Sequence, residues 1–250
     1  MTLSTIDESQ RTAARIAGFT LLFAMAIVIF GEFYISSNLI VPGNAAETAR
    51  NIMAHETRFR INIACDLIYV VNLVVLLSAL YVILKPVNRS LALAAAFFRL
   101  VYAMMWVVTA LNMLGALRLL GGGTYLSVFE ADRLQALARL HLRANFDTYY
   151  VGLPFFGLAS TVCSYLWFKS RYIPRALAAF GVISSAWCVM CAFVFIVFPN
   201  FNETVNDWWF DTPMGIFEMA MGFWLLFKGL RPSGMAGPDK ASDRAQVGAA

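Results

Sequence analysis

Charged side chains are scarce in this sequence of 250 residues. Asp, Glu, Lys and Arg make up 14% of it, whereas soluble domains carry roughly 25%. Hydrophobic residues make up 60%, and the mean hydropathy is +0.68. They occur in long blocks without a polar face, and such a block must contact lipid or other apolar helices on every side. We therefore expect an all-α membrane protein rather than a water-soluble domain.

Residues and motifs that often carry metals or catalysis are equally few. With only two histidines, His55 and His141, a three-histidine metal site is impossible. No Gly-x-Ser-x-Gly elbow, phosphate-binding loop or His-Glu-x-x-His motif occurs. The cysteines lie inside apolar blocks and are better explained by packing than by zinc or disulfides; they are Cys65, Cys163, Cys188 and Cys191. We predict no catalytic residue, metal or cofactor, and a non-enzymatic protein is favoured.

Six apolar blocks match the length that a membrane helix needs. A hydrocarbon layer of about 30 Å takes about 20 helical residues. The blocks cover residues 16–36, 61–84, 91–117, 148–168, 176–198 and 212–227. The sequence therefore predicts a polytopic bundle with about six spans in one domain, residues 1–230. Residues 231–250 are rich in Gly, Ala, Pro and charge, which predicts a disordered cytoplasmic tail.

Basic residues in the connections predict the orientation. The short connections after the second and fourth blocks are basic, whereas residues 199–211 hold three acids and no Lys or Arg. The basic residues of those connections are Lys85, Arg89, Lys169, Arg171 and Arg175. Because Lys and Arg resist translocation, both termini are expected in the cytoplasm. Basic residues scattered between apolar blocks do not form a nucleic-acid patch, so the predicted partner is the lipid bilayer.

Two outer loops carry helix-start signals. Asn44 with Glu47, and Ser127 with Glu130, have the spacing of a capping residue and the residue that reaches back to it. Each pair predicts a short helix lying along the membrane interface. In the second loop, three leucines alternate with three arginines at near-helical spacing, which suits either lipid headgroup binding or a solvated helix resting on the bundle. These leucines are Leu134, Leu137 and Leu140.

Ionisable and amide side chains inside the blocks are the strongest functional signals, because a charge at mid-bilayer costs on the order of 3 kcal/mol or more. With the expected orientation, Glu32, Asp66 and Glu218 belong to the outer half. The sequence predicts a polar pocket that opens outward and binds a small solute, a cation or a lipid headgroup. The residues of this predicted pocket are Glu32, Arg60, Asp66, Asn72, Arg99 and Glu218.

The same charges have a structural interpretation. Arg58 or Arg60 can neutralise Glu32 or Asp66 in an ion pair that only fixes helix packing. Arg99 lies about a third of the way across from the cytoplasmic side, where it can snorkel, bind an anionic group or meet a carboxylate.

Several fragments resemble a family of bacterial multi-pass membrane proteins, domain-of-unknown-function family 4386. They are Glu32 with the loop 39–43, Phe59-Arg60 before Asp66, residues 80–89, Phe98-Arg99, 151–157 and 170–175. The resemblance covers about residues 13–230 and implies a six-helix membrane domain, a place in the bacterial cytoplasmic membrane and no assigned activity. The chain departs from the family pattern at residues 159–163, where Ala-Ser-Thr-Val-Cys replaces a glycine-rich stretch.

Three functions follow as hypotheses. The first is a membrane protein that binds or translocates a small solute, cation or lipid through the outward pocket. The second is an intramembrane lipid-modifying enzyme that uses an acid pair for proton transfer. The third is a structural or regulatory subunit in which the same charges form packing ion pairs.

Overall fold

The computed structural model describes residues 6–198, 201 and 208–232, and these are almost entirely helical, with no strand among them. The helices are α1 (Glu8–Ile29), α3 (Ala45–Ala54), α4 (Glu56–Leu84), α5 (Arg89–Leu120), α6 (Ala131–Ser170), α7 (Arg175–Val197) and α8 (Trp208–Phe223). α1 continues through the π-helix η1 (Phe30–Ser36) into α2 (Ser37–Leu39), and α8 continues into the π-helix η4 (Trp224–Lys228). A 3-10 turn, η2 (Thr124–Leu126), precedes α6. The prediction of an all-α bundle is confirmed.

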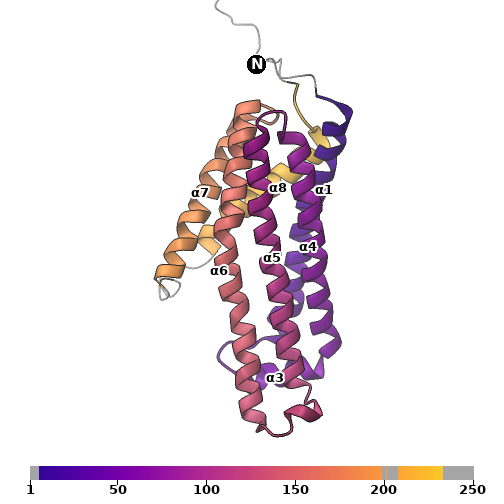
Figure 1. The fold of residues 1–250 in the computed structure, drawn as a ribbon, viewed down its shortest axis with the longest axis vertical. Coiled ribbons are helices and arrows are strands. Elements are labelled where there is room, and N and C mark those ends of the chain that lie inside the picture. The colour runs from indigo at the N-terminus through magenta and orange to yellow at the C-terminus, as the bar shows by residue number, and fades with distance from the viewer. Residues whose placement is uncertain (1–5, 199–200, 202–207, 233–250) are drawn as a thin grey trace, which may run out of the picture.

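The long helices form a closed ring. α1, α4, α5, α6, α7 and α8 each pack against the next in chain order, and α8 closes the ring against α1 (Figure 1). Short connections join α4 to α5 and α6 to α7, so neighbours run antiparallel. Side chains on the inner face of each helix therefore meet in a common interior.

The ring has two distinct ends. At the terminal end, the backbone N–H of Arg231 donates to the Tyr172 carbonyl, and the Gln10 side chain donates to the Ile83 carbonyl. These contacts hold the start of α1 and the end of η4 beside the α4–α5 and α6–α7 connections. At the distal end lie α3 and the connection between α5 and α6 (Figure 1).

Five of the helical segments are long and apolar enough to cross a membrane. They are Glu8–Leu39, Glu56–Leu84, Arg89–Leu120, Ala131–Ser170 and Arg175–Val197. A sixth segment joins the 16 residues of α8 to the 5 of η4 and runs along the same ring. The chain is thus a helical membrane protein. The count of six spans stays a prediction, as do the domain limits, and residues 233–250 of the predicted tail lie outside the described residues.

Two apolar cores fill the ring. The larger core lies toward the terminal end and draws on all six long helices, with Leu73, Trp167 and Phe210 fully buried. The smaller core lies toward the distal end and joins η1, α2, α3, α4, α5 and α6 around Ile52 and Phe59. α7 and α8 contribute nothing to the smaller core. The distal end is therefore a narrower bundle that extends beyond α7 and α8.

Helix starts follow the capping side chains in the sequence. The Asp7 carboxylate accepts the Gln10 backbone N–H at 2.7 Å, and the Gln10 side chain accepts the Asp7 backbone N–H at 3.2 Å. This reciprocal pair satisfies two donors that a helix start leaves free, and the first of its hydrogen bonds holds the pKa of Asp7 below its ordinary value. Asn88 accepts the Leu91 backbone N–H in the same way and starts α5.

Of the two short helices expected in the outer loops, the structure contains one. α3 is a separate short helix, and the Asn44 side chain both accepts the Glu47 backbone N–H and donates to the Glu47 carboxylate. The second expectation is wrong, because Glu130 starts α6 without a side-chain cap and the Ser127 hydroxyl instead donates to the Thr124 carbonyl.

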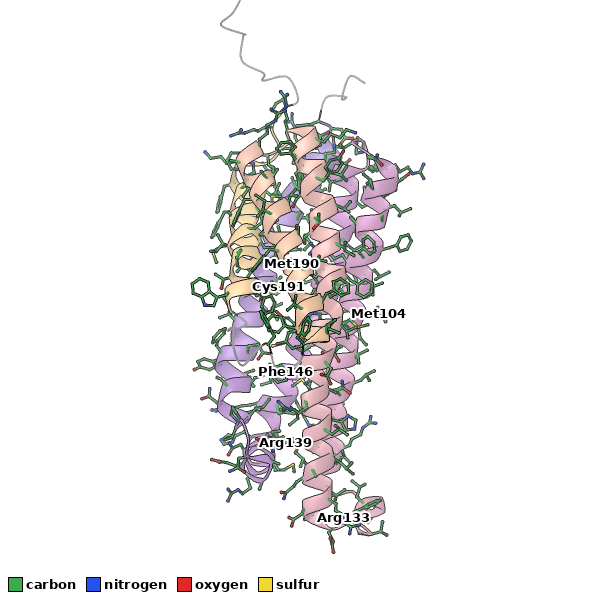
Figure 2. The ribbon with its side chains drawn as sticks, turned by 90° about the vertical axis from the view of Figure 1, so that its left-hand side faces the viewer. Met104, Arg133, Arg139, Phe146, Met190 and Cys191 are labelled. Carbon is green, nitrogen blue, oxygen red and sulfur yellow. The ribbon has the colours of Figure 1, made fainter. Side chains whose placement is uncertain are left out.

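The expected second interfacial helix is instead the first part of a 40-residue α6. Residues 131–145 contain no Gly or Pro to stop a helix, so α6 continues into the span predicted from residue 148. Its buried side chains there are Ala138 and Leu142, whereas Leu137 and Leu140 are 43% and 67% exposed. Figure 2 shows the extension, with Arg133 near its tip.

Candidate functional site

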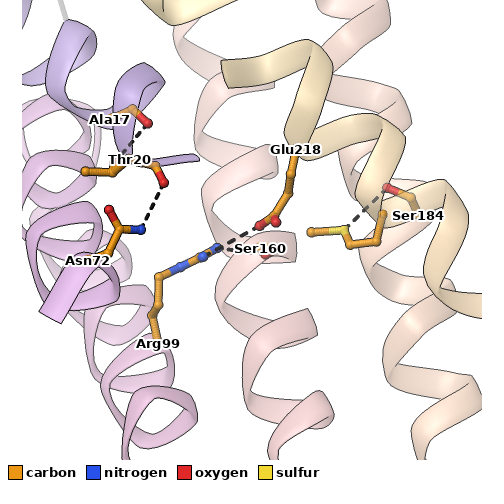
Figure 3. A network of polar contacts seen from close by, with 8 residues as sticks. Ala17, Thr20, Asn72, Arg99, Ser160, Ser184 and Glu218 are labelled. Atoms are coloured by element: carbon orange, nitrogen blue, oxygen red, sulfur yellow. Dashed lines mark hydrogen bonds and ion pairs between the residues drawn. The ribbon is translucent and has the colours of Figure 1, made fainter. Parts of the chain in front are cut away.

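Arg99 and Glu218 meet inside the ring. Nη1 of Arg99 lies 3.6 Å from Oε1 of Glu218, and the two side chains are 5% and 17% exposed. Nη2 of Arg99 also donates to the Ser160 hydroxyl at 2.9 Å, and the guanidinium lies 5.4 Å from the centre of the Phe156 ring. Of the three interpretations of Arg99, the structure supports the one in which it meets a carboxylate. The pair joins α5, α6 and α8 (Figure 3).

This pair lies at matching heights on α5 and α8. Arg99 is ten residues from the start of α5 at Arg89, and Glu218 is ten residues from the end of η4 at Lys228. At 1.5 Å per residue, both lie about 15 Å from the terminal end. The expectation that Glu218 belongs to the outer half of the membrane stays a prediction.

Every helix of the ring contributes a polar group at about this depth. The Asn72 amide donates to the Thr20 carbonyl at 2.9 Å, which links α4 to α1. The Ser184 hydroxyl on α7 lies 3.8 Å from the sulfur of Met214 on α8. We call this set the central polar layer; it consists of Thr20, Asn72, Arg99, Ser160, Ser184 and Glu218 (Figure 3). Several of these polar groups satisfy one another, but Nε and Nη1 of Arg99 are buried without a hydrogen-bond partner among the described residues.

An aromatic group lies between the central polar layer and the distal end. The rings of Tyr69 and Trp106 are 4.7 Å apart, and Tyr102 packs against Trp106 at 6.4 Å. The charges of Glu218 and Arg99 both act on Tyr69. Tyrosine hydroxyls in an apolar bundle are polar groups that a proton or ion can contact.

Asp211 is a site residue that the sequence reasoning missed. Its Oδ2 accepts a hydrogen bond from the Tyr149 hydroxyl at 3.2 Å. Asp211 was counted among the acids of a connection, yet it lies within α8, seven residues before Glu218. Because two helical turns take about seven residues, both carboxylates point to one face. That spacing was the signal in the sequence.

A second polar group, the distal acid site, lies where η1 packs on α4. It consists of Asn62, which is buried, Asp66, which is half-buried, and Glu32, which is exposed. Glu32 lies in η1 and Asp66 in α4, and these two elements pack against each other. Asp66 is 18 residues from the terminal end of α4 at Leu84, or about 27 Å, which is near the far edge of the hydrocarbon layer.

Two hydrogen-bond acceptors at the distal acid site have no partner. They are Oδ1 of Asn62 and Oδ2 of Asp66, which are buried atoms without a hydrogen-bond partner among the described residues. One N–H of the Asn62 amide donates to the hydroxyl of Ser36 at 2.9 Å. Asn62 is 4% exposed, so water does not freely replace the missing partners.

Arg60 does not neutralise this site. Its guanidinium bonds the Glu56 carboxylate at 2.7 Å on the exposed surface of α4. The structural interpretation in which Arg60 pairs with Glu32 or Asp66 is therefore not supported. The residues of the predicted pocket divide into the central polar layer and the distal acid site, with Arg60 outside both.

Metal-binding side chains do not gather in the described part of the chain. No group of three or more His, Cys, Asp or Glu residues placed to hold a metal ion occurs there. The four cysteines are free thiols.

Comparisons with known proteins give a family but no activity. A family model described as "Domain of unknown function (DUF4386)" matches residues 16–229. The chain is similar to an uncharacterized protein of Archaeoglobus fulgidus, with 24% identity over 156 residues, covering 62% of this chain and 75% of that protein. No solved structure matches the chain.

Proposed function

Because this chain belongs to the family of the Domain of unknown function (DUF4386), whose description assigns no activity, we propose a function from its geometry. It binds a small cation, either a proton or an alkali-metal ion, at the distal acid site and passes it through the central polar layer. The lipid-modifying enzyme and the structural subunit remain the alternatives.

The unpartnered acceptor oxygens of Asn62 and Asp66 at the distal acid site carry this proposal. Glu32, Asn62 and Asp66 offer carboxylate and amide oxygens, and neighbouring Arg60 is already paired with Glu56. Buried acceptors without donors cost free energy, and two nearby carboxylates repel each other. A cation or an added proton relieves both costs at once.

A line of polar side chains supports passage inward from this site. Tyr69 lies three residues after Asp66, one helical turn nearer the central polar layer. Its ring contacts Trp106, which contacts Tyr102. The proposed order of transfer is from Asp66, past these aromatic residues, to Glu218.

Cation binding is tested by thermal unfolding of the purified protein in detergent. The Tm is measured in sodium, potassium or lithium chloride against choline chloride at equal ionic strength. A ligand that binds only the folded state stabilises it by about 2.7 kcal/mol at a hundred times its Kd. We expect the Tm to rise with one of these cations, and the rise to vanish in Asp66→Asn.

Glu56→Gln is the matched control, since it removes a carboxylate from the same helix at an exposed ion pair. It should keep the cation-dependent rise. If wild-type protein shows no rise with any of these cations and no change in Tm across the pH range of carboxylate titration, the binding proposal is wrong.

Translocation needs a separate measurement. Proteoliposomes loaded with a pH-sensitive or a sodium-sensitive dye report flux under an imposed membrane potential. We expect flux in wild type and Glu56→Gln, and its loss in Asp66→Asn and Glu218→Gln. Cation-dependent stabilisation without flux would limit the function to binding.

The orientation is proposed with both termini in the cytoplasm of a bacterium. Support comes from the terminal end of the ring, where Lys85, Arg89, Lys169, Arg171 and Arg175 lie. Basic residues favour the cytoplasmic side. A reporter that fluoresces only in the cytoplasm, fused to the C-terminus, should be bright, whereas a periplasmic phosphatase fused there should be inactive.

A further inference from the structure

A long groove runs between α1 and α4 on the outer surface of the ring. It has two stretches of about 520 and 740 Å³ that share Ile16 and Val75. The walls are mostly apolar, and Phe19 and Val71 are 58% and 65% exposed, so the groove faces the bilayer. On α1 it extends from Glu8 to Phe23, fifteen residues or about 22 Å. The groove is therefore longer than the hydrocarbon layer of one leaflet, which is about 15 Å thick.

Two arginines lie near the terminal end of this groove. Arg15 lines the groove, Arg11 precedes it by one helical turn on the same face of α1, and Glu8, which also lines the groove, precedes Arg11 by three residues. Both arginines are exposed, and neither forms an ion pair or a side-chain hydrogen bond with any residue that the structure describes. Like charges four residues apart on a helix destabilise it. Glu8 forms no ion pair with either arginine among the described residues, so two positive charges face one negative charge and favour an anion at this position.

The direction of these side chains suits a lipid headgroup. Helical side chains tilt toward the helix N-terminus, so Arg11 and Arg15 point to the terminal end of the ring. Gln10 bonds the Ile83 carbonyl at the last turn of α4. Arg15, five residues further, lies about 7 Å inside that level and its long side chain reaches back to the interface.

We propose that this groove binds an anionic phospholipid of the leaflet on the terminal side. The phosphate contacts the guanidinium groups of Arg11 and Arg15, which bind phosphate oxygens through paired N–H donors. One acyl chain follows the apolar wall past Ile16, Phe19 and Val75. The site lies on the outside of the ring and does not depend on cation binding at the distal acid site.

Lipid retention by the full-length protein tests the proposal. The protein is reconstituted in vesicles of equal parts phosphatidylcholine and phosphatidylglycerol, extracted in mild detergent and examined by native mass spectrometry. Two arginines beside an anionic lipid give an expected preference for phosphatidylglycerol of roughly tenfold or more. In the double variant Arg11→Gln/Arg15→Gln the preference should fall to about that of the vesicle.

Arg89→Gln is the matched control, because Arg89 is an exposed arginine at the same end of the ring but outside the groove. It should keep the preference. Val75→Trp fills the groove and should lower the retention of both lipids, and an excess of inorganic phosphate should displace neither. No preference in wild type, an unchanged preference in the double variant, or an equal loss in Arg89→Gln would overturn the proposal. The cation-dependent Tm shifts do not involve Arg11 or Arg15. The lipid preference therefore tests this proposal independently of the proposed cation binding.

Discussion

The central polar layer and the distal acid site use charged residues in opposite ways. In the first, Arg99 and Glu218 bring a positive and a negative charge together, and Ser160 takes a further donor of Arg99. In the second, the acidic side chains Glu32 and Asp66 come from adjacent segments, and two acceptor oxygens stay unpartnered within the described residues. Removing one partner of a compensated buried pair leaves a bare charge and destabilises the fold, whereas acids without a counter-charge are candidates for a ligand site. Four sets of variants test this contrast.

The largest effect is expected at Arg99. Arg99→Met leaves Glu218 as a buried charge without a partner, which destabilises the fold by about 3–5 kcal/mol. The double variant Arg99→Met/Glu218→Met removes both charges and should recover most of the loss. Unfolding by a denaturing detergent, followed by circular dichroism, measures each change. Additive losses in the double variant would show that the two residues do not act as a pair.

Gly18 and Gly31 differ in what an added Cβ atom would meet. A Cβ on Gly18 would lie 2.5 Å from the Leu226 backbone nitrogen and 2.8 Å from the Gly222 carbonyl oxygen, so Gly18→Ala must separate α1 from α8 and η4. Such overpacking costs about 1–3 kcal/mol. A Cβ on Gly31 would meet the Asn62 side-chain oxygen at 2.8 Å, and a side chain can move. Gly31→Ala should therefore destabilise less, while changing the cation dependence of the Tm.

Opposite signs are expected for two acid-to-amide changes. Glu218→Gln removes the counter-charge of Arg99 and should destabilise the protein. Asp66→Asn removes a repelling charge and adds a donor among free acceptors, so it should be neutral or stabilise by about 1 kcal/mol. The same detergent titration, without added cation, measures both. Equal destabilisation by the two changes would remove the distinction between the two sites.

The smallest effect is expected at Asp7, outside the membrane-spanning part. Hydrogen bonds from the Gln10 backbone and the Ser9 hydroxyl lower the pKa of Asp7. A carboxylate with a lowered pKa in the folded state stabilises the fold above its ordinary pKa of about 3.9, and this contribution is lost as pH falls through the lowered value. Asp7→Ala should therefore lower the Tm slightly at pH 6, and the difference from wild type should disappear in strong acid. Any acid-induced change that remains in Asp7→Ala belongs to other carboxylates.

Much of the fold was readable from the sequence because apolar blocks and capping residues act locally. Lys85-Pro86 ends α4 where expected, and Gly121 follows α5. A separate short helix was expected before Thr148 from the capping pair Ser127 and Glu130, and this was wrong. The absence of a helix-breaking residue after Glu130 was the stronger signal, and α6 is continuous. The π-helices η1 and η4 had no signal in composition or periodicity.

The sites were only partly readable. The free-energy cost of placing a charge inside an apolar block identified Arg99, Glu218 and Asp66 as candidate site residues. It did not predict which of them lie together. Pairing depends on how far each helix extends past its neighbours, and apolar blocks in the sequence do not define this; α8, for example, starts at Trp208, before the apolar block does. Ser160 and Asp211 were missed because hydroxyls and acids at span ends are common and cost little.

The length of α6 has a mechanical consequence. Its 40 residues span about 60 Å, twice the hydrocarbon thickness, without a loop in between. The part beyond α7 packs with α3 and α5 around the smaller core, so the distal ends of these helices move together. A tilt of about 10° at the membrane moves the tip about 5 Å sideways when the projecting arm is about 30 Å long. Small rearrangements between α5 and α8 are in this way amplified into displacements on the far side of the bilayer.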